Sequence, residues 1–320
     1  MTPHDNVVIA LGEGPTPSSD KPSPGSEAIE PHYEESWSLV HRVTVLWRIA
    51  TNIRTQREVA RISKLPPFVE TAKRDPRFAF KYLSDDYLVH GFSLGERASC
   101  FQHHYRRLSD SLSHHILRET LHSDITIHEI RNGVNRFSIT MGLSRPYTKE
   151  GELSLSLQVD GEIVYILSFT IIPGWVVHSK SEEVLLISRL QGTPGCYPQI
   201  RLATKSLHDI APPALLLAAI QGFAMAVGIS GLAAVSASTH RYTCKEFAPV
   251  LKEAYDDFFT EIGICKNYKG FFLSSLPLRE KPLEHIKHGH KLRTKQKRAF
   301  KKKVLSSCAE FLRCETSKVL

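Results

Sequence analysis

The sequence predicts an α+β protein in which a group of N-terminal helices precedes one mixed β-sheet. Between residues 121 and 190, apolar and polar residues alternate in segments joined by tight turns. Beyond residue 200, helical segments alternate with strand-like segments. The composition, 42% hydrophobic and 23% charged residues, is that of a globular chain long enough to bury a large core. We expect a disordered leader at 1–30, a helical region at 31–120, the mixed-sheet core at 121–280 and a basic helical tail at 281–320.

The leader has no pattern of an export signal. Its apolar run, 7–11, is short and is preceded by Asp5 rather than by lysines, and Pro, Ser and Gly dominate as far as about Glu30. The six cysteines have no short spacing that would indicate a disulfide framework or a structural zinc site. We therefore expect reduced thiols and a cytoplasmic protein.

Helices are expected from residue 36 to about residue 120. Apolar residues keep helical spacing until Pro66-Pro67, which is expected to end the run. A second helix is marked by Ser93-Leu-Gly-Glu96, which has the pattern of a capping box.

Two β-hairpins should follow. Asn132-Gly133 and Asp160-Gly161 each separate two strand-like segments, and these dipeptides favour tight hairpin turns. Leucines alternate with Ser154, Ser156 and Gln158, so this strand should have one apolar face. The expected strand pairs are 125–131 with 134–143, and 153–159 with 162–172.

The remaining core alternates strands and helices. After a strand at 184–190 we expect helices over 200–227 with a break at Pro212-Pro213, a buried strand at 232–237 and a last strand near 270–276. The uncharged stretch 211–239 is interpreted as helix and strand, and no transmembrane span is predicted. An amphipathic helix ending at Gly263 should bury Phe247, Val250, Leu251, Ala254, Phe258 and Ile262.

A candidate pocket lies where the meander changes to the crossover unit, because an open sheet leaves a cleft at such a point. The order of elements there resembles the GCN5-related N-acyltransferase fold, whose Arg/Gln-x-x-Gly-x-Gly/Ala loop grips the pyrophosphate of coenzyme A. Arg189-x-x-Gly192 matches the first half of that loop, but Pro194 stands where Gly or Ala is expected. A plain strand-to-helix turn is the alternative interpretation. The candidate pocket or anion-binding residues are Arg189, Gln191, Gly192, Arg201, Lys205 and His208.

No catalytic residue, metal site or resident cofactor is predicted. The cluster His285, His288 and His290 contains Gly289 and has no Cys or carboxylate ligand beside it. Acyl-CoA would be a ligand only if the protein is an acyltransferase, so whether the chain is an enzyme stays open.

The charge is concentrated near the C-terminus. The chain has a net charge of +8, and the segment 281–303 has ten Lys or Arg against one acid, so the rest is close to neutral. An apolar stripe from Phe300 to Leu312 indicates a helix that could dock on the body, lie on an anionic bilayer or bind nucleic acid. The candidate contact residues are Lys287, Lys291, Arg293, Lys295, Lys297, Arg298, Lys301, Lys302 and Lys303.

Several segments together resemble the VirK/YbjX family of Gram-negative bacteria over roughly residues 65–305. This resemblance implies a virulence-associated factor that supports display of an outer-membrane virulence protein and resistance to cationic antimicrobial peptides. It implies no catalytic residues. The segments are Phe101-Gln-His-His-Tyr-Arg-Arg-Leu108, Gly151-Glu-Leu-Ser-Leu with Asp160-Gly161, Arg189-Leu-Gln-Gly192, Tyr255-Asp-Asp-Phe-Phe259 and Lys281 to Arg298.

Three functional hypotheses follow. The first is a VirK/YbjX-like cell-envelope factor that acts by binding, from the cytoplasm or the inner face of the membrane, with an anionic membrane surface or an envelope protein as partner. The second is an acyltransferase that uses acyl-CoA or acyl-carrier protein. The third is a nucleic-acid-binding protein that uses the basic tail.

Overall fold

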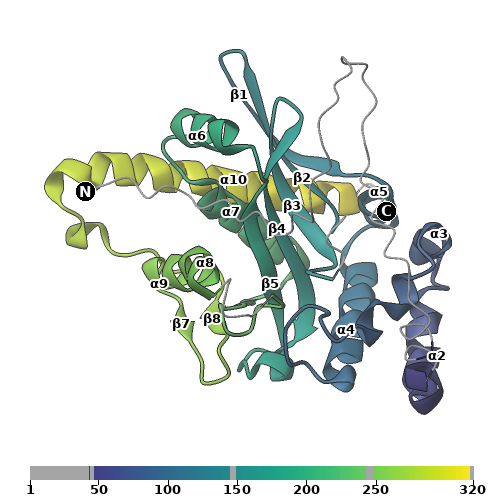
Figure 1. Ribbon diagram of the computed structural model, residues 1–320. Helices are drawn as coiled ribbons and strands as arrows, with labels where there is room; N and C mark the ends of the chain where they lie inside the picture. The colour runs from purple at the N-terminus through teal and green to yellow at the C-terminus, as the bar shows by residue number, and fades with distance from the viewer. Residues whose placement is uncertain (1–42, 44–46, 145–148, 243–247, 318–320) are drawn as a thin grey trace, which may run out of the picture.

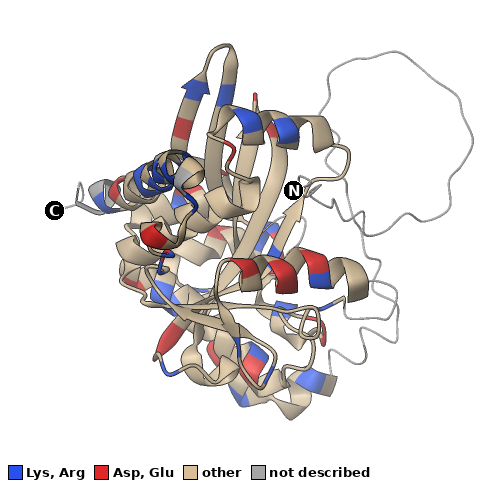
Figure 2. Ribbon diagram, turned by 90° about the vertical axis from the view of Figure 1, so that its left-hand side faces the viewer, with Lys and Arg blue, Asp and Glu red and all other residues tan. Residues whose placement is uncertain are grey.

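The computed structural model describes residues 43, 47–144, 149–242 and 248–317. Its centre is one open, eight-stranded mixed sheet with the strand order β1-β2-β3-β4-β5-β6-β8-β7. Helices α7 and α10 lie on one side of this sheet, and α8 and α9 lie on the other (Figures 1 and 2). The predicted α+β class with one mixed sheet is therefore confirmed. The predicted leader, 1–30, and the start of the predicted helical region, 31–42, lie outside the described residues.

The N-terminal helices pack around an aromatic cluster. Tyr105 lies at its centre, with ring centroids 5.1 Å from Phe68, 4.8 Å from Phe78 and 4.8 Å from Phe101. Pro66 begins a new helix as well as ending the previous one, since proline fits the first turn. The capping box at Ser93 is present as predicted. The elements are α2 Ile53–Ile62, α3 Pro66–Arg74, the 3₁₀ helix η1 Phe78–Leu83, α4 Leu94–Ser111 and α5 His114–His122.

A buried carboxylate joins these helices to the sheet. Glu152, which directly precedes β3, accepts hydrogen bonds from the Tyr87 and Tyr105 hydroxyls and from Lys81 Nζ at 2.6 Å. The Lys81 and Glu152 side chains are 8% and 0% exposed. A buried carboxylate is tolerated when its oxygens are saturated in this way.

The four meander strands follow the predicted hairpins closely. Val134 is the exception, because it lies in the turn and is 98% exposed. The predicted apolar face packs against α7, as the 5.0 Å contact between the Phe169 and Phe223 rings shows. The strands are β1 Ile125–Asn132, β2 Asn135–Leu143, β3 Leu153–Val159 and β4 Glu162–Pro173.

The crossover unit also has the predicted order, with two corrections. The buried strand ends at Ala234 rather than at residue 237, and a short strand, β7, pairs with β8 without having been predicted. The break between the two helices at Pro212 is present. The elements are β5 Glu183–Gly192, α6 Tyr197–Ser206, α7 Pro212–Val227, β6 Gly231–Ala234, α8 Ala248–Leu251, the π-helical segment η3 Lys252–Asp257, α9 Phe258–Glu261, β7 Cys265–Lys266 and β8 Phe272–Ser275.

The basic tail docks on the body. Helix α10, Lys291–Ser317, buries Val304, Cys308 and Leu312 against α7. The two helices approach closely at Gly222, where an added Cβ would lie 2.4 Å from the carbonyl oxygen of Leu305. The apolar stripe of the tail is therefore used for packing, and the basic residues lie on the remaining faces of the helix (Figure 2).

Within the described residues, no helix has both the length and the apolar character needed to cross a bilayer. Helix α7 covers much of the uncharged stretch 211–239, and it is buried between the sheet and α10. The described cysteines, Cys100, Cys196, Cys265 and Cys308, are free thiols.

Candidate functional site at the divergence of β5 and β6

The two parallel strands β5 and β6 part in the middle of the sheet. They pair only from Leu185 with Leu232 to Ile187 with Ala234, and the last backbone bond runs from Val235 N–H to the Ile187 carbonyl at 3.0 Å. Ser236 then turns the chain away, with hydrogen bonds between residues 236 and 239–240. The C-terminal half of β5 thus loses its neighbour strand at the kind of position where open sheets bind ligands.

A tyrosine hydroxyl occupies the place of the missing strand. The Leu190 N–H donates to Tyr255 Oη at 3.2 Å, and Tyr255 is completely buried. Tyr255 lies in the π-helical segment η3. Of the predicted face, Leu251 is buried as expected, Val250, Ala254, Phe258 and Ile262 are only half-buried, and Phe247 lies outside the described residues. The wider turn adds Tyr255 and Phe259 to the buried face. Such π turns occur frequently at functional sites.

His240 completes a pair with this tyrosine. His240 Nδ1 accepts the Tyr242 N–H at 3.3 Å, so the proton of the neutral ring is assigned to Nε2, which lies 3.2 Å from Tyr255 Oη. Burial, then the charges of Arg241 and Arg189, lower the pKa of His240 to about 3. Burial, then the charge of Glu150, raise the pKa of Tyr255. Both groups are therefore neutral at pH 7, and Tyr255 Oη receives two donors while its own proton stays available.

A buried ion pair lies beside this pair. Arg189 Nη1 donates to Glu150 Oε2 at 2.6 Å, and the two side chains are 5% and 1% exposed. The Tyr242 side chain also hydrogen-bonds Glu150, whereas Glu150 Oε1 has no hydrogen-bond partner among the described residues. Burying two charges costs free energy, and apolar residues packed in the same place would not have this cost. Buried titratable groups of this kind are found frequently at functional sites.

The ion pair adjoins a row of small polar side chains on the same face of the sheet. Arg189 lies opposite Ser168, Ser168 opposite Ser154, and Gln191 lies in the next row. Ser154 and Ser168 bond each other at 2.8 Å, whereas Gln191 Nε2 is buried without a partner among the described residues. Leucines of β3 fill the opposite face. The polar residues of this face, all buried, are Ser138, Thr140, Ser154, Ser156, Ser168, Arg189 and Gln191.

The six predicted pocket residues separate into three places. Arg189, Gln191 and Gly192 lie together on β5, whereas Arg201 and Lys205 are exposed on α6. The His208 ring packs 4.7 Å from the Phe300 ring of α10 and belongs to the docking contact of the tail. The structure thus brings together half of the predicted set.

The turn before α6 lacks the expected features of a pyrophosphate grip. The backbone N–H groups of Thr193 and Cys196 bond to the carbonyls of Val164 and Thr193. Glu162 accepts Cys196 Sγ at 3.3 Å and Gln199 Nε2 at 3.1 Å, so a carboxylate lies beside the helix N-terminus. A second anion there would be repelled. The diphosphate of coenzyme A does not fit this turn.

Sequence reasoning missed four residues of the site: Glu150, His240, Tyr242 and Tyr255. Their separation along the chain gives no motif, and Tyr255 lay off the face that ordinary helical spacing predicts. The one available signal was the alternation of Ser154 and Ser156 with leucines, which indicated a polar sheet face but not that this face is buried.

The predicted basic contact residues are partly used by the body. Arg293 pairs with Asp209 at 2.7 Å, and Arg298 and Lys301 lie 3.0 and 3.5 Å from Glu280. Lys287, Lys295, Lys302 and Lys303 are exposed and form no ion pair with another described residue. Lys297 Nζ donates to the Asp209 carbonyl, and Lys291 is half-buried.

The comparison with known proteins gives one family. Neither the curated proteins nor the solved structures include a match. The family described as "Protein of unknown function (DUF535)" matches residues 37–303, which include the whole sheet, the divergence of β5 and β6 and the first half of α10. The match extends over more than half of the chain, and the protein therefore belongs to the DUF535 family.

Proposed function

We propose that the protein transfers an acyl group from a thioester on a pantetheine arm to an amine or hydroxyl acceptor, at the divergence of β5 and β6. The observation that carries this proposal is the Tyr255–His240 pair at the freed edge of β5, beside the Glu150–Arg189 ion pair. An amide-containing arm can pair with a strand edge of this kind, and displacement of the Tyr255 hydroxyl from the Leu190 N–H would give it a donor.

The chemistry follows from the protonation states. The acceptor attacks the thioester carbonyl, its proton passes to the unpartnered Glu150 Oε1, and the C–S bond breaks. The leaving thiolate takes the Tyr255 proton, and the His240 Nε2–H, which stays on Tyr255 Oη when the arm takes the Leu190 N–H, stabilises the phenolate that results. Loss of the product thiol and return of the proton from Glu150 restore the site.

The donor is expected to be an acyl-carrier protein rather than acyl-CoA. Both present the same thioester, but the carboxylate of Glu162 beside the α6 N-terminus disfavours a diphosphate. The exposed cations Arg201 and Lys205 on α6 would suit a carrier with an acidic surface.

Calorimetric titration tests the binding step. Acyl-carrier protein and acyl-CoA of the same chain length are titrated into the wild-type protein and into Tyr255→Phe, with the unacylated carrier as control. We expect the acylated carrier to bind both proteins. When an acceptor is present, the rate of acyl transfer should fall by about 10²-fold or more in Tyr255→Phe because a general acid is lost. Absence of heat with both donors at millimolar concentration would exclude acyl transfer.

The cellular role that we propose is that of a VirK/YbjX-like factor in envelope adaptation, which membership in DUF535 supports. The test uses a Gram-negative strain without its own copy of the gene, complemented with wild type or Tyr255→Phe and challenged with a cationic antimicrobial peptide. Survival of the strain with wild type but not with Tyr255→Phe would indicate that this cellular role depends on the Tyr255 hydroxyl. Equal survival of the complemented and empty-vector strains would contradict it.

A second candidate function is electrostatic attachment to an anionic membrane. The apolar side of α10 is docked, so Lys287, Lys295 and Lys302 would act through charge alone, at about 1 kcal/mol each. Nucleic-acid stacking is disfavoured, since Phe300 packs on His208. The triple change of these lysines to Gln should weaken co-sedimentation with anionic vesicles by about a hundredfold, whereas Arg293→Gln, which breaks a pair with Asp209, should have a much smaller effect. Unchanged binding of the triple variant would exclude this surface.

A further inference from the structure

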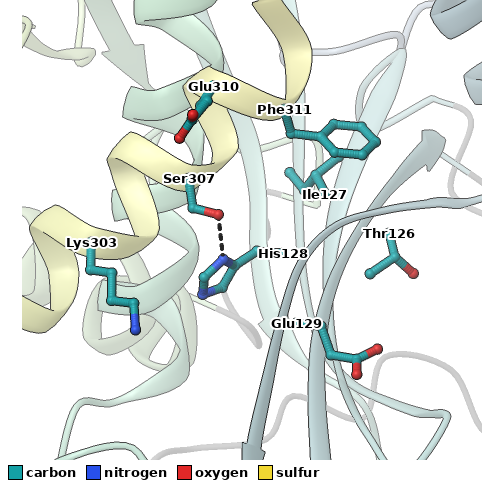
Figure 3. Close-up of a pocket in the computed structure, with 8 residues that line it drawn as sticks. All are labelled: Thr126, Ile127, His128, Glu129, Lys303, Ser307, Glu310 and Phe311. Carbon is teal, nitrogen blue, oxygen red and sulfur yellow. Dashed lines mark hydrogen bonds between the residues drawn. The ribbon is translucent and has the colours of Figure 1, made fainter. Parts of the chain in front are cut away.

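An open hollow of about 530 Å³ lies at the other end of the sheet, between β1 and α10. It is far along the strand order from the divergence of β5 and β6, and the function proposed above does not use it. Figure 3 shows its two walls, the helix on one side and the strand on the other. The lining residues are Thr126, Ile127, His128 and Glu129 from β1, and Lys303, Ser307, Glu310 and Phe311 from α10.

The hollow runs along the free edge of the sheet. Strand β1 is the first strand in the order and, among the strands that the structure describes, pairs only with β2. Four consecutive residues line the hollow, although successive side chains of a strand point to opposite faces. This is possible where a groove follows the strand edge itself. The pairing with β2 also shifts between Thr126 and His128, which leaves Ile127 without an opposite residue.

No other described strand pairs with the backbone of this edge. Beyond their bonds to β2, residues 126–131 have no backbone hydrogen bond to another described residue. An unpaired strand edge is a template for the addition of another strand, and proteins usually cover it or interrupt it with charges. Here α10 stands beside the edge and leaves a groove.

A buried contact fixes the width of the groove. His128, 9% exposed, accepts or donates a hydrogen bond between Nδ1 and Ser307 Oγ at 2.9 Å. Burial, then the charge of Lys303, lower the pKa of His128, so the ring is neutral at pH 7. This contact and the packing of α10 on α7 hold the helix at a constant distance from the strand.

The helix wall has an apolar end and two charged side chains. Phe311 and Ile127 form an apolar patch at one end. Lys303 and Glu310 are exposed and have no ion pair with another described residue, and seven residues of helix place them about 10 Å apart. Glu129 is neutralised by Arg131 at 3.0 Å and by Arg136 at 3.4 Å. Side chains of an extended chain that are four positions apart share one face and lie about 13 Å apart, within reach of both free charges.

We propose that this groove binds an extended segment of a partner protein, which adds as a strand along β1 and lays side chains against α10. Backbone pairing with the free edge of β1 would supply affinity, as in other strand-addition sites between an edge strand and a helix. Specificity would come from an apolar side chain near Phe311, an acidic residue beside Lys303 and a basic residue beside Glu310.

Binding of short synthetic peptides to the full chain tests this. The probe is a set of fluorescent, capped heptapeptides with the two charged residues, one acidic and one basic, at positions 1 and 5 and a Leu at position 7, so that all three face the same side of the strand, in both charge orders. We expect one order to bind at least about threefold more tightly, from two exposed charge pairs. We expect loss of binding when alternate amides of that peptide are N-methylated, because the added strand would lose its donors.

Two variants make the test specific. The double variant Lys303→Glu, Glu310→Lys reverses the charges of the groove and should reverse the preferred charge order. Lys302→Glu changes an exposed lysine that does not line the hollow, and it should leave the preference unchanged. Full binding of the N-methylated peptide, no reversal in the double variant, or no binding of either charge order to the full chain would each overturn the proposal.

Discussion

The Tyr255→Phe variant removes one buried oxygen atom and leaves the aromatic ring in place. In the wild type, Tyr255 Oη is 3.2 Å from both the Leu190 nitrogen and His240 Nε2, and neither Tyr255 nor His240 is exposed. The ring packing should be unchanged, since Phe has the same shape. The variant therefore isolates the two hydrogen bonds that close the gap between β5 and β6.

The expected cost follows from the two donors that lose their acceptor. A buried polar group that is left unsatisfied costs about 1–3 kcal/mol. Two such groups give about 2–6 kcal/mol, less about 1 kcal/mol because a hydroxyl no longer needs to be buried. We expect a loss of about 1–5 kcal/mol, a large fraction of the stability of a typical domain.

Urea unfolding of wild type and variant measures this loss. The midpoint should fall while the slope m stays constant, because the surface exposed on unfolding is unchanged. Tyr268→Phe is a matched control, since Tyr268 is 80% exposed and its hydroxyl bonds His178 at the surface; it should change stability by less than about 0.5 kcal/mol. A loss below about 0.5 kcal/mol in Tyr255→Phe would refute the assignment of both donors.

Three further predictions concern the packing and charge of the core. Gly222→Ala places a Cβ 2.4 Å from the Leu305 carbonyl oxygen, so the overpacking cost of about 1–3 kcal/mol should outweigh the helix-propensity gain of about 1 kcal/mol. Thermal unfolding measures the resulting loss of stability, and an unchanged Tm would contradict the prediction. Glu152→Gln leaves the Lys81 ammonium buried without its counter-charge and should cost about 3–5 kcal/mol in urea unfolding, whereas a loss under about 1 kcal/mol would show that the ion pair contributes little. His240 has a folded pKa of about 3 and an ordinary value of 6.5, so the unfolded chain binds the extra proton between these values. Stability should fall as the pH falls from about 6.5 to about 3, and His240→Gln should make the measured fall shallower; identical pH profiles would contradict the buried, neutral histidine.

Much of the fold could be predicted from local patterns. The turns at Asn132-Gly133 and Asp160-Gly161 and the alternation of β3 identify the meander, since side-chain period and turn chemistry are local properties. The docking of α10 could not be derived in this way. The same apolar stripe would suit a bilayer, and only the close approach at Gly222 shows that α7 covers it.

The candidate site was predicted less completely for a similar reason. Strand pairing brings Glu150 to Arg189, 39 residues away, and the turn after β6 brings His240 to Tyr255, so neither contact follows from local spacing. The position of Tyr255 depends on a π turn, which shifts the buried face of a helix and leaves no mark in the spacing of its apolar residues.

Hydrogen exchange with mass spectrometry tests the central claim most directly, because it reports where an acyl donor binds without knowledge of the acceptor. We predict that the acylated carrier slows exchange at 188–193 and 236–242, and that the unacylated carrier does so less. Slowed exchange confined to other parts of the chain, or no change anywhere under saturating donor, would contradict a thioester site where β5 and β6 part.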